Sequence, residues 1–380
     1  MNEDVVRRFQ VRVPKAAEVA ENLTALAAKL QVKIRIEPKQ PADHDVLTVR
    51  LRGTPRATAA VRRSVPGGAR ITRDLVDLPP GGPPPGGLRH VYPDPRVLAR
   101  IDPDETSISD PAPKGRAVVA IVDSGIAAEH PDLVNHLWRG PNGEHGVCVM
   151  DPPADPRDVS DQAGHGTMLA GSVLGAANKA PGIELMAVKI FDAAAEPAAV
   201  TAARGIREAV ARRADIINIS FDLGIGSRDL EAAVGEACAA GKLLVFAAGN
   251  TGSNNDVYPL APSRYAALCP DNTLVVMASD WYDERPTFSN FGPRTVDLAA
   301  PGVRILTTRA RWADGRRYGH YTGTSPAAAH VSGALALLMA RFPGLKAKDL
   351  KSRLLGNAED VQAMKVPRQK CHSGARLRLA

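Results

Sequence analysis

The sequence predicts an α/β protein whose main part is a doubly wound, mostly parallel sheet, preceded by a small α+β domain. Three observations predict this architecture. Residues 115–380 hold continuous apolar runs separated by helical stretches, residues 1–78 alternate short strands with helices, and residues 79–114 form a connector rich in proline and glycine. A chain of 380 residues, of which 44% are hydrophobic, is long enough to bury the cores of two such domains.

The first domain, residues 1–78, combines stretches of period-two alternation with stretches of helical periodicity. Strands are expected at 9–13, 32–36, 46–51 and 69–75, and helices at 16–30 and 54–65. The resulting β-α-β-β-α-β order is that of a ferredoxin-like fold. Because this fold carries many unrelated functions, the order alone assigns none.

The charge of the chain is unevenly distributed. Residues 1–100 carry 18 basic and 10 acidic side chains (net +8), residues 101–340 carry 20 and 28 (net −8), and residues 341–380 carry 10 and 3 (net +7). The basic first part could dock on the acidic middle or bind nucleic acid, or its arginines could simply face solvent. Phe9 and Tyr92 are the only aromatic residues before position 100, which argues against base stacking and nucleic-acid binding.

Composition excludes several classes of protein. No apolar run approaches the ~20 residues of a membrane span, so no membrane partner is expected. The first residues mix charges and lack the apolar stretch of a secretory signal, which predicts a cytoplasmic protein with reduced thiols. The cysteines show no close pairing pattern, and the one in an alanine-rich helical stretch is expected to pack in the core. They are Cys148, Cys238, Cys269 and Cys371.

The second domain, residues 115–380, begins with the apolar run 117–122, as expected of a strand buried on both faces of a parallel sheet. Further strands are expected at 185–190, 216–219, 243–247 and 274–277, with helices at 198–213 and 230–240. Ligands of doubly wound sheets bind beyond the carboxyl ends of the strands. Polar residues that follow these runs are therefore the first candidates for chemistry.

Three polar residues stand at such positions. Asp123 ends the first apolar run, His165 opens a helix of small residues, and Ser325 precedes a long apolar helix. Taken singly, they could be a helix cap, a core histidine and an N-cap. Together they are the residue types of nucleophilic acyl transfer, in which a hydroxyl attacks, an imidazole takes its proton and a carboxylate orients the imidazole.

The local sequence around each of the three resembles one family, the subtilisin-like serine proteases. The matching blocks are residues 123–133, 164–171 and 323–333, in the family's order Asp, His, Ser. The resemblance covers about residues 115–378. It implies a serine endopeptidase that hydrolyses peptide bonds of a polypeptide substrate through an acyl-enzyme, without a cofactor.

The resemblance extends to the oxyanion hole and the substrate cleft. Asn250 ends a strand like the family's oxyanion residue, and its amide is expected to act together with the backbone N–H of Ser325. The cleft is expected to include Ser220, Phe221, Asp222, Ala247, Ala248 and Gly249. Asp222 stands where the family usually has glycine. A carboxylate there would favour a basic substrate residue or restrict which side chains fit, unless it turns to solvent.

The chain also departs from the family pattern. Pro326 and Ala329 differ from the usual residues of the serine block, and Met168 replaces a frequent histidine, which predicts changes of packing only. Residues 176–182 lack the asparagine-rich insertion that holds calcium in many subtilisins. Asp132 remains as one ligand of a site that needs six to eight oxygens, so no metal is expected.

Two questions stay open at the level of sequence. Residues 1–78 resemble the family's pro-domains in order and length, which implies a chaperone or inhibitor docked on the enzyme, or else a retained partner-binding domain. The activity could be hydrolysis, or peptide maturation or transpeptidation of the same chemistry in which an amine resolves the acyl-enzyme. A catalytically silent binding protein on this fold is a third hypothesis.

Overall fold

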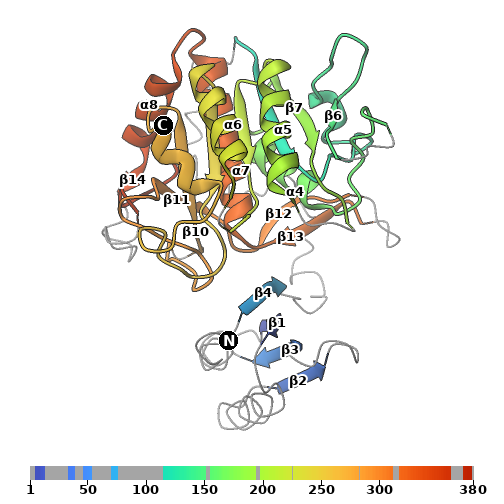
Figure 1. Cartoon of the computed structure of the whole chain (residues 1–380), viewed down its shortest axis with the longest axis vertical. Helices are drawn as coiled ribbons and strands as arrows, with labels where there is room; N and C mark the ends of the chain where they lie inside the picture. The colour runs from blue at the N-terminus through green and yellow to red at the C-terminus, as the bar shows by residue number, and fades with distance from the viewer. Residues whose placement is uncertain are drawn as a thin grey trace, which may run out of the picture. The chain divides into compact units, whose positions relative to one another are not determined.

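The computed structural model divides the chain into two compact units, Met1–Arg89 and His90–Ala380 (Figure 1). It describes residues 114–378 except 151–154, 194–196, 225, 282, 311–315 and 361–370, together with four strands before residue 76. The predicted connector, except its last residue, and the two predicted N-terminal helices lie outside the described residues.

The N-terminal unit contains one antiparallel sheet with the strand order β2-β3-β1-β4. The four strands overlap the predicted stretches, although the first begins four residues before the predicted 9–13. They are β1 Val5–Arg12, β2 Lys33–Pro38, β3 Val46–Gly53 and β4 Arg70–Leu75. β1 and β2 are not neighbours in this sheet, because β3 lies between them.

The second unit is built on a sheet of nine strands in the order β14-β15-β11-β10-β9-β8-β5-β7-β6, and all described pairs except β14–β15 are parallel. The strands are β5 Ala117–Asp123, β6 Gly146–Cys148, β7 Ile183–Lys189, β8 Ile216–Ile219, β9 Leu243–Ala247, β10 Thr273–Ser279, β11 Leu298–Pro301, β14 Glu359–Asp360 and β15 Ala375–Arg376. A separate hairpin pairs β12 Ile305–Thr308 with β13 Tyr318–Tyr321. The predicted doubly wound, mostly parallel sheet is confirmed.

Helices cover both faces of this sheet, which explains the continuous apolar runs. They are α4 His165–Ala176, α5 Ala199–Ala211, α6 Arg228–Ala239, α7 Thr324–Arg341 and α8 Ala347–Asn357, with short 3-10 helices η2 Val134–His136 and η3 Ser263–Leu268. Successive residues of β5 enter different cores: Val119 and Ile121 pack with α4 and α7, whereas Val118 and Val122 pack with α5 and α6 (Figure 1). Both faces of β5 are thus apolar.

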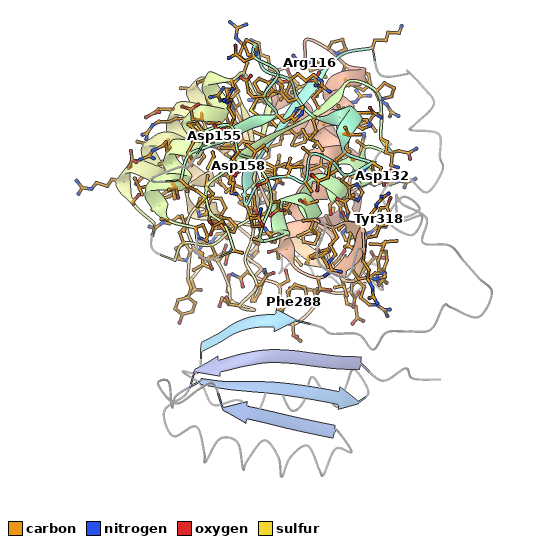
Figure 2. All side chains as sticks on the ribbon, turned by 90° about the vertical axis from the view of Figure 1, so that its right-hand side faces the viewer. Arg116, Asp132, Asp155, Asp158, Phe288 and Tyr318 are labelled. Atoms are coloured by element: carbon orange, nitrogen blue, oxygen red, sulfur yellow. A yellow bond between two sulfur atoms is a disulfide. The ribbon has the colours of Figure 1, made fainter. Side chains whose placement is uncertain are left out.

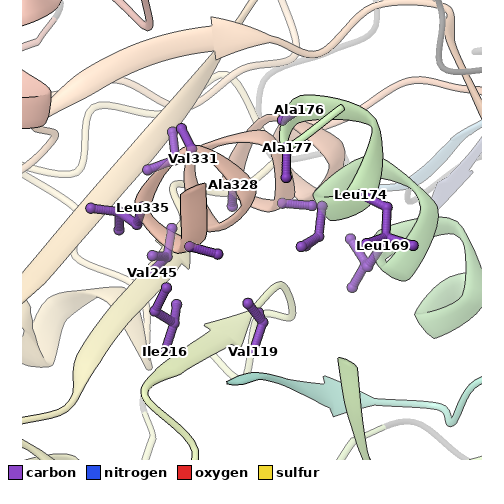
Figure 3. Close-up of a cluster of buried hydrophobic side chains, with 14 of the residues drawn as sticks. Val119, Leu169, Leu174, Ala176, Ala177, Ile216, Val245, Ala328, Val331 and Leu335 are labelled. Atoms are coloured by element: carbon purple, nitrogen blue, oxygen red, sulfur yellow. The ribbon is translucent and has the colours of Figure 1, made fainter. Parts of the chain in front are cut away.

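The core on the α4 and α7 side supports the helices that carry two of the predicted site residues. Figure 3 shows apolar side chains of both helices above strand residues of β5, β8 and β9. The labelled residues include Leu169, Leu174, Ala328, Val331, Leu335, Val119, Ile216 and Val245. Dense packing of this kind holds both helix N-termini in place over the same edge of the sheet.

The expectation of four reduced cysteines is wrong for two of them. Cys238 near the end of α6 and Cys269 after η3 form a disulfide, whereas Cys148 and Cys371 are buried thiols. The two partners are 31 residues apart and meet only because α6 and η3 pack together, which spacing could not show. Within the described ranges, no helix is both long and apolar enough to span a membrane. The cytoplasmic location stays a prediction.

Candidate active site

The carboxyl ends of three neighbouring strands form the base of the site. β5 pairs with β8 so that Val122 lies opposite Ile219, and β8 pairs with β9 so that Ile219 lies opposite Phe246. The register therefore places Asp123, Ser220 and Ala247 in one row across the sheet, each about 4.8 Å from the next. The predicted aspartate and the two segments predicted to flank the cleft share this edge.

Asp123 is fully buried at the end of β5. Its Oδ1 atom accepts hydrogen bonds from the backbone N–H of Ser124 and from Nδ1 of His165, both at 2.8 Å. Its Oδ2 atom is also buried and accepts no hydrogen bond from the described residues. A buried carboxylate with so few donors favours a positive charge on the ring beside it.

His165 begins α4 and presents Nδ1 to that carboxylate. Because a carboxylate only accepts, Nδ1 carries the proton and Nε2 is the nitrogen left for another partner. Burial disfavours the charged ring, but the negative charges of Asp123 and Asp161 and the Asp123 hydrogen bond outweigh it. The pKa of His165 is therefore raised above the ordinary value of 6.5.

Asp161 is a residue of this site that the sequence analysis did not identify. Its carboxylate is buried four residues before His165 and accepts hydrogen bonds from Ser124 Oγ and Thr167 Oγ1 at 2.8 and 2.6 Å. Its bonds to the N–H groups of Ala163 and Gly164 form a local turn. An aspartate just before a helix start is the signal that could have found it.

Ser325 lies in the first turn of α7, with 7% of its surface exposed. Its hydroxyl donates to the backbone oxygen of Ser220 at 3.2 Å, and no hydrogen bond joins it to His165. Ser220 is next to Asp123 in the row of residues at the strand ends, and Asp123 is hydrogen-bonded to His165. The predicted nucleophile and base are thus anchored at neighbouring positions, with the hydroxyl turned to a carbonyl.

The Ser220 hydroxyl connects this half of the site to the core. It accepts a hydrogen bond from the Asn218 amide at 3.0 Å and lies 3.5 Å from the Ser325 carbonyl. Asn218 accepts in turn from Ser332 Oγ at 2.9 Å. This buried polar chain ties the end of β8 to α7.

Asn250 follows β9 and is exposed. Its Oδ1 atom accepts hydrogen bonds from the N–H and the hydroxyl of Thr324, at 2.9 and 3.1 Å. Since both bonds go to the amide oxygen, the NH₂ group is left to face outward as a donor. Thr324 directly precedes Ser325, so the amide is held beside the start of α7.

The other predicted cleft residues lie beside this edge. Gly249 has φ +106°, and a side chain there would meet the amide of Asn290 at 2.5 Å, so only glycine fits. Its N–H donates to Thr324 Oγ1 at 3.2 Å.

Phe221 is partly buried and Ala248 is fully buried, and both lie in the core that α5 and α6 cover. Asp222 is exposed, and its Oδ1 atom accepts from the N–H of Gly224 at 2.7 Å.

The residues around Asp132 do not fit a calcium ion. The Asp132 carboxylate accepts hydrogen bonds from the ammonium of Lys179 and the hydroxyl of Tyr318. Figure 2 labels Asp132 and Tyr318, which lie close together. An ammonium and a phenol are donors, not cation ligands. Among the described residues, no three His, Cys, Asp or Glu side chains come together as metal ligands. The positive charge of Lys179 balances the Asp132 carboxylate, as a bound cation would.

Comparisons with known proteins agree with this architecture. The model of the subtilase family, Peptidase_S8, matches residues 114–373. A thermostable alkaline protease of Halalkalibacterium halodurans is 33% identical over 290 residues, which cover 70% of this chain and 73% of the relative. A subtilisin of Bacillus pumilus is 32% identical over 247 residues, 63% of this chain and 82% of the relative.

Two solved structures are similar as well. The nisin leader peptidase NisP of Lactococcus lactis has a TM-score of 0.59 and 25% identity, covering 75% of this chain and 91% of that one. The epidermin leader peptide processing serine protease of Staphylococcus aureus has a TM-score of 0.62 and 19% identity, covering 99% and 97%. The second likeness concerns the fold alone. Since the family model spans more than half of the sequence, this chain belongs to the subtilase family of serine peptidases.

Proposed function

We propose that the protein is a serine endopeptidase in which Ser325 is the nucleophile, His165 the general base and Asp123 the group that orients His165. The observation that carries the proposal is the 2.8 Å bond between His165 Nδ1 and Asp123, at the strand end next to the Ser220 carbonyl that holds the Ser325 hydroxyl. This juxtaposition supplies a serine, an oriented imidazole and a buried negative charge at one edge of the sheet.

The proposed reaction begins when the Ser325 hydroxyl leaves the Ser220 carbonyl and turns to Nε2 of His165. The hydroxyl oxygen attacks the peptide carbonyl while its proton passes to Nε2, and the imidazolium is stabilised by Asp123. The NH₂ group of Asn250 and the N–H of Ser325 stabilise the oxyanion. The peptide C–N bond breaks as His165 protonates the amine, and water hydrolyses the remaining ester.

Labelling with a fluorophosphonate tests the nucleophile. The wild type should be phosphonylated once, Ser325→Ala should not be labelled, and His165→Ala should label far more slowly. Ser263→Ala is a matched control, because Ser263 is a buried serine of η3 whose hydroxyl donates to the Leu260 carbonyl at 3.0 Å, outside the strand-end row and α7. A folded wild type that resists labelling would instead support a binding protein without catalysis.

Peptide maturation is the second candidate, favoured by the likeness to the nisin leader peptidase. The acyl-enzyme of such a maturation enzyme could be resolved by water or by an amine, and these two outcomes give different products from one synthetic precursor. Hydrolysis adds the mass of one water across the two fragments, whereas transfer to an amine joins the amine to the new carboxyl end. Mass spectrometry of the reaction with and without an added amine separates them.

Asp222 is proposed to favour a basic side chain in the substrate. Its exposed carboxylate lies two residues after Ser220, which binds the nucleophile. Asp222→Asn keeps an oxygen for the N–H of Gly224 and removes only the charge. We expect a drop of up to about tenfold in kcat/KM for an arginine substrate, which added salt diminishes, and no change for the alanine counterpart. Equal effects on both substrates would contradict this role.

The basic N-terminal unit is proposed to inhibit the enzyme or assist its folding. Its residues 1–89 carry 16 basic and 9 acidic side chains (net +7), opposite in sign to the net −8 of residues 101–340. Mass spectrometry of an active preparation provides the test. Cleavage between residues 76 and 117 supports a removable pro-domain, whereas an intact and active chain indicates a retained domain.

A further inference from the structure

The Asp161 carboxylate is the centre of a buried hydrogen-bond cluster beside the proposed base. Its Oδ1 atom accepts from Ser124 Oγ at 2.8 Å, Gly164 N at 2.7 Å and Ala163 N at 3.1 Å. Its Oδ2 atom accepts from the N–H and the hydroxyl of Thr167, at 2.8 and 2.6 Å. Five donors thus converge on one buried side chain.

Two of these donors are hydroxyls that tie the Asp123 loop to the helix of His165. Ser124 Oγ also accepts the N–H of Gly166 at 2.9 Å, and Thr167 Oγ1 also accepts the N–H of Ala127 at 3.0 Å. Each hydroxyl has a single proton, and giving it to Asp161 turns a lone pair toward the backbone N–H. Because Asp161 accepts both hydroxyl protons, the two hydroxyl oxygens are oriented to accept the N–H groups of Gly166 and Ala127.

The two backbones are also in close contact at this point. A Cβ atom on Gly166 would lie 2.1 Å from the carbonyl oxygen of Gly125, so the first turn of α4 rests directly on the loop after Asp123. A small change in the ties would change the separation of Asp123 and His165, whose hydrogen bond is 2.8 Å long.

We propose that Asp161 is a positioning residue of the active site: through Ser124 and Thr167 it clamps the loop after Asp123 onto the first turn of α4 and so sets the geometry of the Asp123–His165 pair. The inference rests on the proposed function, because it assigns His165 as the base. Asp161 does not touch the reacting atoms and acts through its neighbours and its charge.

Few charges act on this region. Asp123 on β5 and Asp161 both raise the pKa of His165. Lys189 at the end of β7 donates to the Ser160 carbonyl at 2.7 Å, next to Asp161. On β13, burial raises the pKa of Tyr321 to about 12. The positive charge of Arg309 opposes that rise and the negative charge of Asp161 adds to it, so the phenol stays neutral. Removing the Asp161 charge should therefore lower the pKa of His165.

The test measures the rate of fluorophosphonate labelling of the full chain from pH 5 to 9. Asp161→Asn is expected to lower the plateau rate by about 10- to 100-fold, because misplaced groups lose near-attack geometry, and to move the acidic limb to lower pH. Ser124→Ala is expected to lower the plateau without moving the limb. Asp158→Asn is the matched control from the same loop, since its exposed carboxylate bonds only within residues 158–160.

Each outcome decides a separate question. A folded Asp161→Asn with the wild-type plateau and limb overturns the inference, and a lower plateau with an unmoved limb overturns the charge contribution. If Asp161→Asn does not fold, Ser124→Ala and Thr167→Val decide, and wild-type rates in both overturn the clamp. A folded wild type that is not labelled overturns the proposed function itself, and this inference with it.

Discussion

The two halves of the proposed active site are held in different ways. On the Asp123 side, the carboxylate, the imidazole and Asp161 are joined by buried side-chain hydrogen bonds. On the Ser325 side, the hydroxyl bonds to a backbone carbonyl and Asn250 stands exposed at the end of β9. The hydrogen bonds of the charged half are already formed in the fold, whereas the proposed nucleophile is bound to a carbonyl that it would have to leave to act.

This difference shows where each half draws its stability. The buried pair depends on charges that cannot be removed singly without leaving an unpaired partner. The serine half depends on backbone groups at the ends of β8 and β9 and on the start of α7. Substitutions in each half test this division.

Removing the nucleophile and the base should show that the two halves act as one unit. Ser325→Ala is expected to lower kcat by about 10⁶-fold, the loss that the equivalent substitution causes in subtilisin, and His165→Ala by a similar factor. The double variant should be no slower than either single one. If the two losses in kcat multiplied in the double variant in steady-state assays, the two residues would act independently, which would contradict this view of the two halves.

Asn250→Ala removes the proposed oxyanion donor on the exposed side. We expect kcat to fall by about 10²- to 10³-fold with little change in KM, because the donor acts on charge that develops in the transition state. Asn254→Ala is a control from the following loop. A rise in KM at constant kcat would instead assign Asn250 to ground-state binding.

The pH dependence of activity should report the charged half. The pKa of His165 is raised above 6.5, so kcat/KM is expected to fall about tenfold per pH unit below that raised value, where the base becomes protonated. The same shift stabilises the fold below pH 6.5, and this contribution is lost as the pH rises through the raised pKa.

Activity and stability should therefore respond oppositely to pH through this one group. The free energy of unfolding is measured at several pH values for the wild type and for His165→Gln. The variant should lack the pH-dependent contribution of His165. If the acidic fall in kcat/KM of the wild type had its midpoint below pH 6.5, this would contradict the raised pKa of His165.

The smallest effect is expected at the edge of the Asp123 side, where Lys179 pairs with Asp132. Burial raises the pKa of Asp132, but bonds from Lys179 and Tyr318 lower it below 3.8, so its stabilisation holds above pH 3.8 and is lost as pH falls further. Lys179→Met should reduce the free energy of unfolding by about 0.5–1 kcal/mol, because the pair is partly exposed.

A chelator distinguishes this pair from a metal site. Thermal unfolding of the wild type should be unchanged by a calcium chelator, and Lys179→Arg should remain close to the wild type. A chelator that lowers the wild-type midpoint as much as Lys179→Met does would show that a metal ion stabilises the fold.

Much of the fold could be predicted from sequence because its signals are local. The run 117–122 is apolar throughout, and a strand with helices on both faces has no polar face to show. Asp123, His165, Asn250 and Ser325 could be named because each stands in a short motif at the end of an element. Their roles in catalysis stay predictions until the variants are measured.

Other features required contacts between distant segments. Cys238 and Cys269 pair because a helix and a 3-10 turn pack together, and Lys179 meets Asp132 across 47 residues. Asp161 stands in a polar loop without periodicity. Its importance appears only where the loop after Asp123 and the first turn of α4 meet around it.

Sequence alone thus predicted the four N-terminal strands, the five central strands of the large sheet, helices α4 to α7 and the family, because hydrophobic pattern and short motifs act over a few neighbouring residues. Strands β6 and β11 to β15 and helix α8 were found only in the structure. Tertiary structure alone decided which hydroxyls face Asp161, which carbonyl the Ser325 hydroxyl binds, and which ammonium neutralises Asp132. Hydrogen bonds and ion pairs depend on distances of a few tenths of an ångström between chain segments, and only the packed sheet sets those distances.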